Sequence, residues 1–401
     1  MITQQLLAEV LDSQNENWLN KDQGVIREKL DEIKIHPGFA CIITGVRRCG
    51  KSTLMRQLLS KVSGNSLFLN FEDPRLTAFE NDDFRRLDNE LNSRKIKNLF
   101  LDEVQMLDNW ELYVRQKLDE DFKVIVTGSN ASLLSRELGT KLTGRHQSFE
   151  LFPFSMNEFL TFKKKKISLQ TMTDYMEEGG FPDFLKIKDA SILQHLLNDI
   201  LMRDIAVRYG VRDSVSLQRL AVYLISNIGR SVSANNLSKL FQIKATSTLL
   251  EYFSFLEDAY LVQFVPKFSF SQKVQIRNPK KVYSIDLGLF SHNTTNFTEN
   301  SGWRLENLVY LHYRRIGREI YYFSEKRECD FVIFHNGKIE EVVQVCYEIN
   351  QDNLKREIDG LKEAMDFFGL KKGSIVTFNQ EDSFDVDGSE INLKTLKSLL
   401  S

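Results

Sequence analysis

A glycine-rich segment with a lysine and a serine lies near the start of the chain. Residues 45–52, GVRRCGKS, match the pattern G-x-x-x-x-G-K-[ST] of a phosphate-binding loop. The two glycines let the backbone turn so that successive N–H groups face phosphate oxygens. Lys51 can then reach the β- and γ-phosphates of a nucleotide, and the Ser52 hydroxyl can bind Mg²⁺. We predict an ATP and Mg²⁺ site formed by Gly45, Val46, Arg47, Arg48, Cys49, Gly50, Lys51, Ser52 and Thr53.

The neighbouring segments fit this interpretation. The apolar run FACIIT before the loop is typical of a strand, and KSTLMRQLLSKV is typical of a helix, whose N-terminus adds partial positive charge. Farther along, Asp102 and Glu103 follow the apolar run NLFL, as at the carboxyl end of a buried parallel strand, where open α/β sheets bind ligands. We predict that Asp102 helps to hold Mg²⁺ and that Glu103 is the base that polarises the attacking water.

Other polar residues are candidates for the same site. Ser129 or Asn130, after the strand FKVIVTG, can contact the γ-phosphate and orient the water, although ordinary turn chemistry explains them equally well. Glu72 and Asp73 are candidates for lining the same crevice, without an assigned role. Arg145 is a candidate arginine finger, acting in cis or from a neighbouring copy, and a surface arginine is the alternative. The predicted catalytic set is Lys51, Asp102, Glu103 and Arg145.

These motifs, in this order, resemble a known family. GVRRCGKSTL, LFLDEVQ, VTGSN and LTGR…LFPFSMNEF are similar to motifs of bacterial and archaeal AAA-like ATPases that carry a C-terminal domain of unknown function. GGFPDF (179–184), RDIAVRY (203–209) and VYSIDLGL (282–289) continue the resemblance. It implies a P-loop ATPase core, a small helical lid, a winged-helix-like module and a restriction-endonuclease-like tail. It favours Arg145 as the arginine finger and supplies no substrate.

The predicted fold class is therefore α/β. It comprises a P-loop parallel sheet, a helical lid, a winged-helix-like module and a small α/β tail. The predicted domains are 1–155 for the ATPase, 156–204 for the lid, 205–290 for the winged helix and 291–401 for the tail. The turn signal GGFP is expected to fix the orientation of the lid rather than to do chemistry. Residues 24–39, GVIREKLDEIKIHPGF, are candidates for contacts with adenine.

The winged-helix-like module has features that favour DNA binding and features that oppose it. Its third expected helix carries Lys244, Thr246 and Ser247, followed by acidic residues. This set is unfavourable for contacts with base edges. Packing between domains is the alternative role. The expected wing carries more positive charge, at Lys267, Lys273, Arg277, Lys280 and Lys281.

The tail resembles the PD-(D/E)XK nuclease fold. In active members a helix glutamate, a strand aspartate and an E-x-K pair gather Mg²⁺ around a water. Glu306 and Asp330 match the first two positions, but the E-x-K pair falls on Gln344, Val345 and Cys346. Because Cys346 cannot act as a cation, we predict an inactive nuclease-like domain. Its remnant would bind nucleic acid or a protein, or be purely structural.

The composition limits which partners and which cellular compartment we expect for this chain. The net charge of −2 and pI of about 6.4 give no strongly basic footprint for nucleic acid. The four cysteines form no CxxC pair, so we expect a reduced, cytoplasmic compartment. No apolar run is long enough to span a bilayer and no signal peptide is evident, so no membrane contact is expected.

The expected function is Mg²⁺-dependent binding and hydrolysis of ATP, coupled to a conformational switch. A nucleotide-gated module that binds DNA or a protein, with slow hydrolysis, is the alternative. An active Mg²⁺-dependent nuclease is less favoured because the motif lysine is missing. A homo-oligomer is possible, since an arginine finger acting in trans requires one. Cys49, inside the loop, raises the further hypothesis that its oxidation blocks the site, with a small tolerated residue as the alternative.

Overall fold

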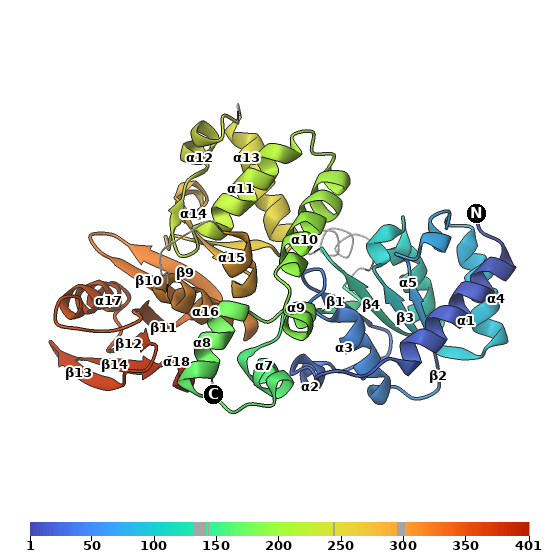
Figure 1. The fold of residues 1–401 in the computed structure, drawn as a ribbon, viewed down its shortest axis with the longest axis horizontal. Helices are drawn as coiled ribbons and strands as arrows, with labels where there is room; N and C mark the ends of the chain where they lie inside the picture. Colours follow the sequence, from blue (N-terminus) through green and yellow to red (C-terminus); the bar gives the residue numbers. More distant parts are fainter. Residues whose placement is uncertain (131–141, 143, 244, 295–300, 401) are drawn as a thin grey trace. The chain divides into compact units, whose positions relative to one another are not determined.

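The computed structural model describes residues 1–130, 142, 144–243, 245–294 and 301–400. The chain divides into two compact units, Met1–Phe162 with Asp258–Tyr260 and Lys163–Glu257 with Leu261–Ser401 (Figure 1). The first 7 residues of the predicted lid, 156–204, lie in the first unit and the rest lie in the second unit. The predicted domain boundaries stay predictions. Within the described residues, no helix has an apolar stretch long enough to cross a membrane.

The first unit is built on five parallel strands in the order β2-β3-β4-β1-β5. This confirms the predicted parallel α/β sheet, and the runs FACIIT, NLFLD and FKVIVTG form three of its strands. All five residues of β1 are buried, which explains why its sequence is continuously apolar. The strands are β1 (Ala40–Thr44), β2 (Asn65–Asn70), β3 (Ile96–Asp102), β4 (Lys123–Gly128) and β5 (His146–Glu150).

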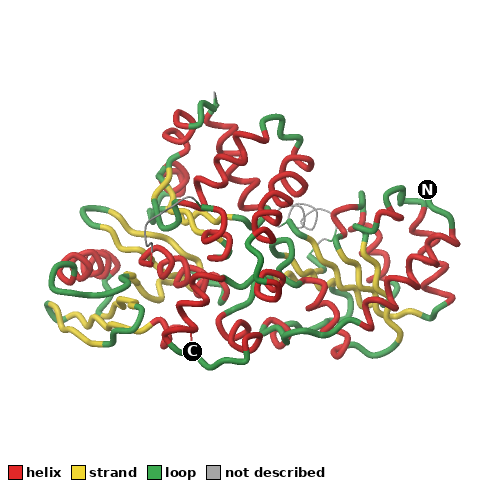
Figure 2. The backbone as a smooth tube through the Cα atoms, in the orientation of Figure 1, coloured by secondary structure: helices red, strands yellow, loops and turns green. Residues whose placement is uncertain are grey.

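Helices cover this sheet and supply its core (Figure 2). Alternate residues of β2, β3 and β4, such as Leu69, Leu101 and Val126, share one apolar cluster with Leu11 and Leu87. Because successive strand residues point to opposite faces of the sheet, the residues between these apolar ones point to the other face. The helices are α1 (Gln4–Asn20), α2 (Lys29–Glu32), α3 (Lys51–Gln57), α4 (Asp83–Ser93), α5 (Trp110–Asp119) and α7 (Met156–Lys163).

The second unit begins with helices and a small antiparallel sheet. The helices are α8 (Leu169–Glu178), α9 (Pro182–Ile187), α10 (Ser191–Asp199), a π-helical segment Ile200–Val207, α11 (Ser214–Ser226), α12 (Ala234–Leu240), α13 (Thr246–Asp258), α14 (Gln272–Arg277) and α15 (Leu287–Asn293). The sheet, in the order β6-β8-β7, comprises β6 (Ser231–Val232), β7 (Val262–Pro266) and β8 (Lys280–Ser284). Of the residues expected on a wing, Lys280 and Lys281 lie on β8, whereas Lys273 and Arg277 lie on the helix α14. The winged-helix assignment stays a prediction, and Lys244 lies outside the described residues.

The second unit ends in a six-stranded sheet in the order β13-β14-β12-β11-β10-β9. Strands β9 to β11 run antiparallel, whereas β11, β12 and β14 are parallel. One face packs on α17, where Val332 and Val342 meet Leu361 and Met365. The elements are α16 (Ser301–Arg315), β9 (Glu319–Ser324), β10 (Glu328–His335), β11 (Lys338–Val345), α17 (Leu354–Phe368), β12 (Lys372–Thr377), β13 (Asp382–Val386), β14 (Ser389–Thr395) and α18 (Leu396–Leu400).

Two motifs that are distant in sequence meet inside the second unit. Asp286, before α15, accepts hydrogen bonds from the backbone N–H groups of Gly180 (2.6 Å) and Gly288 (2.8 Å). A Cβ atom at Gly179 would lie 2.1 Å from the Asp286 carboxylate, so a side chain has no room there. The backbone of the GGFP turn is therefore held by the side chain of Asp286, in the motif VYSIDLGL, which is a structural role.

Candidate functional site

The phosphate loop follows β1 at the carboxyl edge of the sheet. Gly45 has a φ of +149°, and a Cβ atom there would lie only 2.1 Å from the carbonyl oxygen of Leu151. Gly50, with a φ of +102°, is the residue before the first turn of α3. Arg48 also adopts a left-handed conformation, with a φ of +62°. Alternating backbone conformations of this kind form anion-binding concavities, as the motif predicts.

Lys51 lies inside the loop to which it belongs. Its side chain is buried, and Nζ donates to the carbonyl oxygens of Gly45 (3.1 Å) and Val46 (3.2 Å). The same ammonium lies 3.7 Å from the carboxylate of Glu103. The predicted phosphate-binding cation and the predicted base are therefore neighbours. The carbonyl contacts are ones that an incoming phosphate can replace.

Ser52 and Asp102, the predicted Mg²⁺ ligands, are in direct contact. The Ser52 hydroxyl donates to Asp102 Oδ2 over 2.7 Å, although the two residues are 50 positions apart. Thr127 donates to the other carboxylate oxygen. Asp102 is buried, and burial raises its pKa to about 6, with a further contribution from the nearby Glu103 charge. Two hard oxygen ligands of the kind that Mg²⁺ prefers are thus held side by side.

Glu103 is fixed by neighbours that sequence reasoning did not assign. Its φ is +55°, and its N–H donates to the Thr127 hydroxyl over 3.1 Å. Its carboxylate accepts a hydrogen bond from the Gln105 amide, which also donates to the Ser129 hydroxyl over 3.2 Å. Ser129 is therefore linked to Glu103, and Asn130 is buried directly after it. Thr127 and Gln105 lie inside the motifs VTGSN and LFLDEVQ, which was the available signal.

Arg145 lies at the opposite edge of the sheet from the phosphate loop of its own chain. It immediately precedes β5, and the first residue of β1, Ala40, pairs with His146 in parallel register. Five strand residues separate this end of β1 from the loop, or roughly 16 Å. The Arg145 guanidinium donates to the Gly38 carbonyl and pairs with Asp119. The structure therefore does not bring Arg145 to the nucleotide site in cis.

Arg27 is a buried contact of the phosphate loop that sequence reasoning missed. Its guanidinium donates to the carbonyl oxygens of Cys49 (2.7 Å) and Phe152 (2.7 Å) and to the Glu158 carboxylate (2.8 Å). The Glu158 carboxylate also accepts the N–H groups of Glu28 and Ser155. The signals were present, since Arg27 lies in the segment proposed for adenine contacts and Glu158 lies in the LFPFSMNEF motif.

A cavity of about 530 Å³ opens beside the predicted magnesium ligands. Ser52, Asp102, Glu72 and Asp73 all line it, so the two acids share this cavity with the predicted Mg²⁺ ligands. Arg47, in the loop, pairs with the Glu72 carboxylate over 2.7 Å.

Cys49, by contrast, is fully buried, and burial raises the pKa of its thiol. The thiolate that oxidation requires is therefore disfavoured, and the oxidation hypothesis loses its support.

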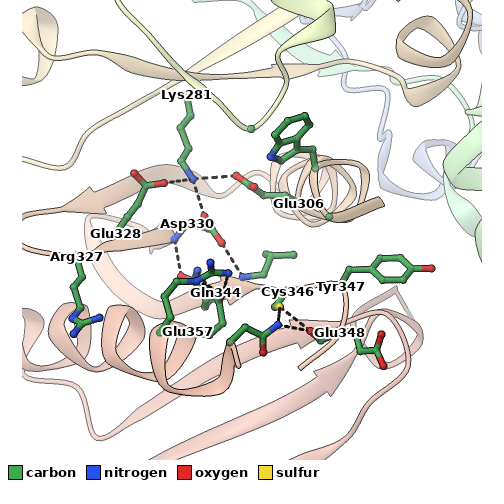
Figure 3. Close-up of a pocket in the computed structure, with 16 residues that line it drawn as sticks. Lys281, Glu306, Arg327, Glu328, Asp330, Gln344, Cys346, Tyr347, Glu348 and Glu357 are labelled. Carbon is green, nitrogen blue, oxygen red and sulfur yellow. Dashed lines mark hydrogen bonds and ion pairs between the residues drawn. The ribbon is translucent and has the colours of Figure 1, made fainter. Parts of the chain in front are cut away.

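The C-terminal unit contains a second cluster of charged residues (Figure 3). Lys281, on β8, is buried, and its ammonium lies 2.7 Å from Asp330, 2.8 Å from Glu328 and 3.1 Å from Glu306. Glu306 also accepts a hydrogen bond from Tyr283 over 2.7 Å. Lys281 was predicted as part of a basic wing. Its burial among three carboxylates removes it from any exposed DNA-binding face.

Gln344 and Val345 of the degenerate nuclease motif are connected to this cluster through Asp330. Asp330 accepts the N–H of Val345 (2.9 Å), and its own N–H donates to the Gln344 side-chain oxygen (3.2 Å). The Gln344 amide then donates to Glu357 of α17 over 2.8 Å. Burial raises the pKa of the Cys346 thiol to about 11, so this residue stays neutral and does not replace a lysine.

Within this cluster, burial and the neighbouring charges shift the pKa values of Lys281 and Glu306 in opposite directions. Burial alone would lower the pKa of Lys281, but Asp330 and Glu306 raise it well above its ordinary value. Burial raises the pKa of Glu306 to about 7, while Lys281 acts in the other direction. The lysine is therefore a permanent cation. The Lys281 ammonium faces the Glu306 carboxylate, whose ionisation depends on burial and on the charges of Lys281 and Asp330.

Comparisons with known proteins agree with the N-terminal site. Residues 38–160 match the model of an AAA domain, and residues 169–300 match a domain of unknown function, DUF8612. The AMPPCP-bound DnaA from Aquifex aeolicus shares 15% identity over 57% of this chain and 85% of its own. The TM-score of this match is 0.28.

Two relatives span nearly the whole chain. An uncharacterized protein of Haemophilus influenzae is 29% identical over 88% of this chain and 92% of its own length. The uncharacterized protein MJ1544 of Methanocaldococcus jannaschii is 35% identical over 90% of this chain and 87% of its own length. The chain therefore contains an AAA domain and belongs to the same protein family as MJ1544.

Proposed function

We propose that the N-terminal unit binds ATP with Mg²⁺ and hydrolyses it, and that the hydrolysis drives a conformational switch. The observation that carries this proposal is the convergence of Ser52, Asp102 and Glu103 at the carboxyl ends of β1 and β3. Ligands of open α/β sheets bind at this edge. The AAA-domain match over residues 38–160 supports the same conclusion.

The residues present fit Mg²⁺ and a triphosphate. Ser52 and Asp102 would hold the ion, which would offset the negative charge of the phosphate oxygens. Lys51 would leave the carbonyl oxygens of Gly45 and Val46 and donate to the phosphates instead. The absence of a side chain at Gly45 keeps the loop backbone close to Leu151 in this conformation.

Glu103 is positioned for the proton transfer. Its carboxylate would accept a proton from the water that attacks the γ-phosphate. Gln105 holds this carboxylate and also contacts Ser129, so the base is oriented by two neighbouring strand ends. Arg145 would act only from a neighbouring copy, because it lies at the other edge of its own sheet.

Steady-state ATP hydrolysis by the full chain tests the proposal. We expect Lys51→Ala to lose nucleotide binding. Glu103→Gln should still bind ATP but lose about 100-fold or more in turnover. Glu9→Gln, an exposed change on α1, is the matched control and should keep the wild-type rate. Wild-type turnover in Glu103→Gln would eliminate the assigned base. Hydrogen exchange with ATP and with ADP would then test the switch.

A further inference from the structure

The cavity beside the predicted magnesium ligands has a wall that the proposed nucleotide chemistry does not use. The volume of the cavity is about 530 Å³, and this wall comes from the end of α1 and from α3, both in the first unit (Figure 1). Trp18 lies in the last turn of α1, and Lys21 directly follows that helix. Arg56 lies one helical turn after Ser52 on α3. The cavity therefore reaches from the magnesium ligands to the end of α1.

Arg56 is a buried cation without a carboxylate partner. The residue is 7% exposed, and its guanidinium donates to the backbone carbonyl oxygen of Asp22. Among the described residues, no carboxylate forms an ion pair with Arg56, and its Nε–H has no acceptor. Burial lowers the pKa of Arg56, and the charge of Asp22 does not cancel this shift. A buried cation of this kind is unfavourable unless an anion compensates it.

Trp18 supplies a second donor without an acceptor on the same wall. It is 4% exposed and stacks on Phe68, with 4.6 Å between the ring centroids and 12° between the ring planes. Phe100 lies against the other side chains of this stack, 5.2 Å from the indole centroid. Within the described part of the chain, the indole N–H has no hydrogen-bond partner. Because the stacking fixes the orientation of the ring, a ligand oxygen in the cavity would recover the cost of this buried donor.

The acids of the same cavity, by contrast, all have partners. Glu72 pairs with Arg47 over 2.7 Å, and Asp73 pairs with Arg75 over 2.7 Å. Asp102 accepts hydrogen bonds from two hydroxyl groups. The buried groups of this cavity that still lack partners are therefore donors, and one of them carries positive charge. They require an acceptor that is negatively charged.

The charge of the wall favours a phosphate group over a carboxylate. Arg56 and the exposed Lys21 supply two positive charges, and the Trp18 N–H adds a neutral donor. A phosphate monoester carries about two negative charges near pH 7 and has more acceptor oxygens than a carboxylate, which carries a single charge. Guanidinium and ammonium groups both bind phosphate readily. A cavity of about 530 Å³ can hold a small phosphorylated molecule as well as the free ion.

We propose that the wall formed by Trp18, Lys21 and Arg56 binds a phosphate group, either as the free ion or as part of a small phosphorylated molecule. Arg56 Nε and the Trp18 indole N–H donate to phosphate oxygens, and Lys21 balances the remaining charge at the exposed side. None of these residues belongs to the phosphate loop at residues 45–52. The site is therefore a second anion site, and it does not depend on ATP hydrolysis.

Calorimetry on the full chain carrying Lys51→Ala tests the proposal, because this change is expected to remove nucleotide binding at the phosphate loop. The probes are inorganic phosphate and ribose 5-phosphate, and acetate is the carboxylate comparison. We expect phosphate to bind and acetate not to bind. Adding Arg56→Gln or Trp18→Phe should each weaken phosphate binding by about tenfold or more. Arg115→Gln, an exposed change on α5, is the matched control and should leave binding unchanged.

A conservative variant guards against misfolding. Arg56→Lys keeps the positive charge but lacks the Nε–H, so it should fold and bind phosphate more weakly than the parent and more tightly than Arg56→Gln. Tighter binding of ribose 5-phosphate than of inorganic phosphate would support a phosphorylated molecule as the ligand, and the reverse order would support the free ion.

Three results would overturn the proposal. The first is no binding of either phosphate probe at millimolar concentration. The second is binding of acetate as tight as that of phosphate. The third is phosphate binding that Arg56→Gln and Trp18→Phe leave unchanged, which would place the anion at the phosphate loop. Because the assay does not use turnover, its outcome is separate from that of the proposed ATPase.

Discussion

Arg27 is the buried side chain that ties the phosphate loop to the rest of the first unit. It joins the Cys49 carbonyl to Glu158, and both side chains of this ion pair are almost fully buried. We predict that Arg27→Ala lowers the free energy of unfolding by about 3–5 kcal/mol, because it leaves the Glu158 carboxylate buried without a cation. Urea unfolding, followed by circular dichroism, measures this change.

Arg75 provides the matched control for this prediction. It pairs with Asp73 over 2.7 Å, but its side chain is 43% exposed. Arg75→Ala should therefore cost less than about 1 kcal/mol. Equal losses of unfolding free energy in Arg27→Ala and Arg75→Ala would show that the buried contacts of Arg27 stabilise the fold no more than a surface ion pair does. The loop would then have to be positioned by its glycines alone.

Asp286 predicts a pH dependence at the residue scale. Burial raises its pKa from 3.8 to about 6, although the N–H groups of Gly180 and Gly288 and the charge of Arg315 oppose the shift. The folded chain thus binds this proton more tightly than the unfolded chain. The contribution of Asp286 to stability is therefore lost as the pH rises from 3.8 through 6. Between pH 5 and pH 7.5 the loss is about 1 kcal/mol.

Asp286→Asn is the reference for this measurement because its side chain does not titrate. The variant leaves one backbone N–H without an acceptor, so its stability is offset at every pH. The informative quantity is the difference in unfolding free energy between wild type and variant, which should fall as the pH rises. A difference that stays constant from pH 5 to pH 7.5 would show that Asp286 is already ionised in the fold.

Single residues also show where sequence reasoning ends. The loop glycines, Ser52 and Asp102 could be predicted because local motifs specify them and parallel strands bring their ends to one edge. Lys281 could not, because it belongs to another sheet and only the folded unit places it beside Asp330. Arg27 lies in the segment proposed for adenine contacts, but no motif indicated its role. Its contacts with Cys49 and Glu158 join segments 22 and 131 residues away.

At the scale of elements, the connection between α8 and α9 depends on a missing side chain. Gly179 has a φ of +68°, and a Cβ atom there would lie 2.1 Å from Asp286 and 2.5 Å from the Gly288 nitrogen. We predict that Gly179→Ala destabilises the second unit by about 3 kcal/mol, since backbone strain adds to a steric clash. Thermal unfolding and urea unfolding both report this loss.

A substitution at Gly210 distinguishes the effect of backbone strain from the effect of the steric clash. Its φ is +63°, yet no atom lies within 4 Å of a Cβ built there. Gly210→Ala therefore carries the backbone strain without the clash and should cost about 1 kcal/mol. If the two variants lose the same stability, the contact between the GGFP turn and Asp286 contributes nothing beyond the turn conformation.

Element types could be predicted more fully than element contacts. Apolar runs without polar interruption indicated β1, β3 and β4, because both faces of these strands are covered. The short helix α14, between β7 and β8, was not predicted. None of its residues is buried, so it lacks the apolar pattern that marks a helix. The order of strands in the two sheets required the structure, because it depends on packing between distant segments.

At the scale of the whole molecule, the position of Arg145 decides between a monomer and an assembly. Because it lies at the amino edge of the sheet, it can reach a γ-phosphate only on a second copy. We predict that turnover per chain rises with protein concentration and that Arg145→Ala reduces turnover by roughly 1,000-fold. Repeating contacts of this head-to-tail kind form rings or filaments, so the active species should be larger than the monomer in gel filtration.

Mixing variants tests this prediction directly. Lys51→Ala cannot use its own site but still offers Arg145, whereas Arg145→Ala keeps an intact loop. Neither should hydrolyse ATP alone, and their mixture should recover activity because each interface can combine one good loop with one arginine. The double variant with both changes offers neither, so mixing it with Arg145→Ala should restore nothing. Wild-type turnover in Arg145→Ala alone, at every concentration, would rule out the finger. Its contacts with Asp119 and with the Gly38 carbonyl oxygen would then be structural.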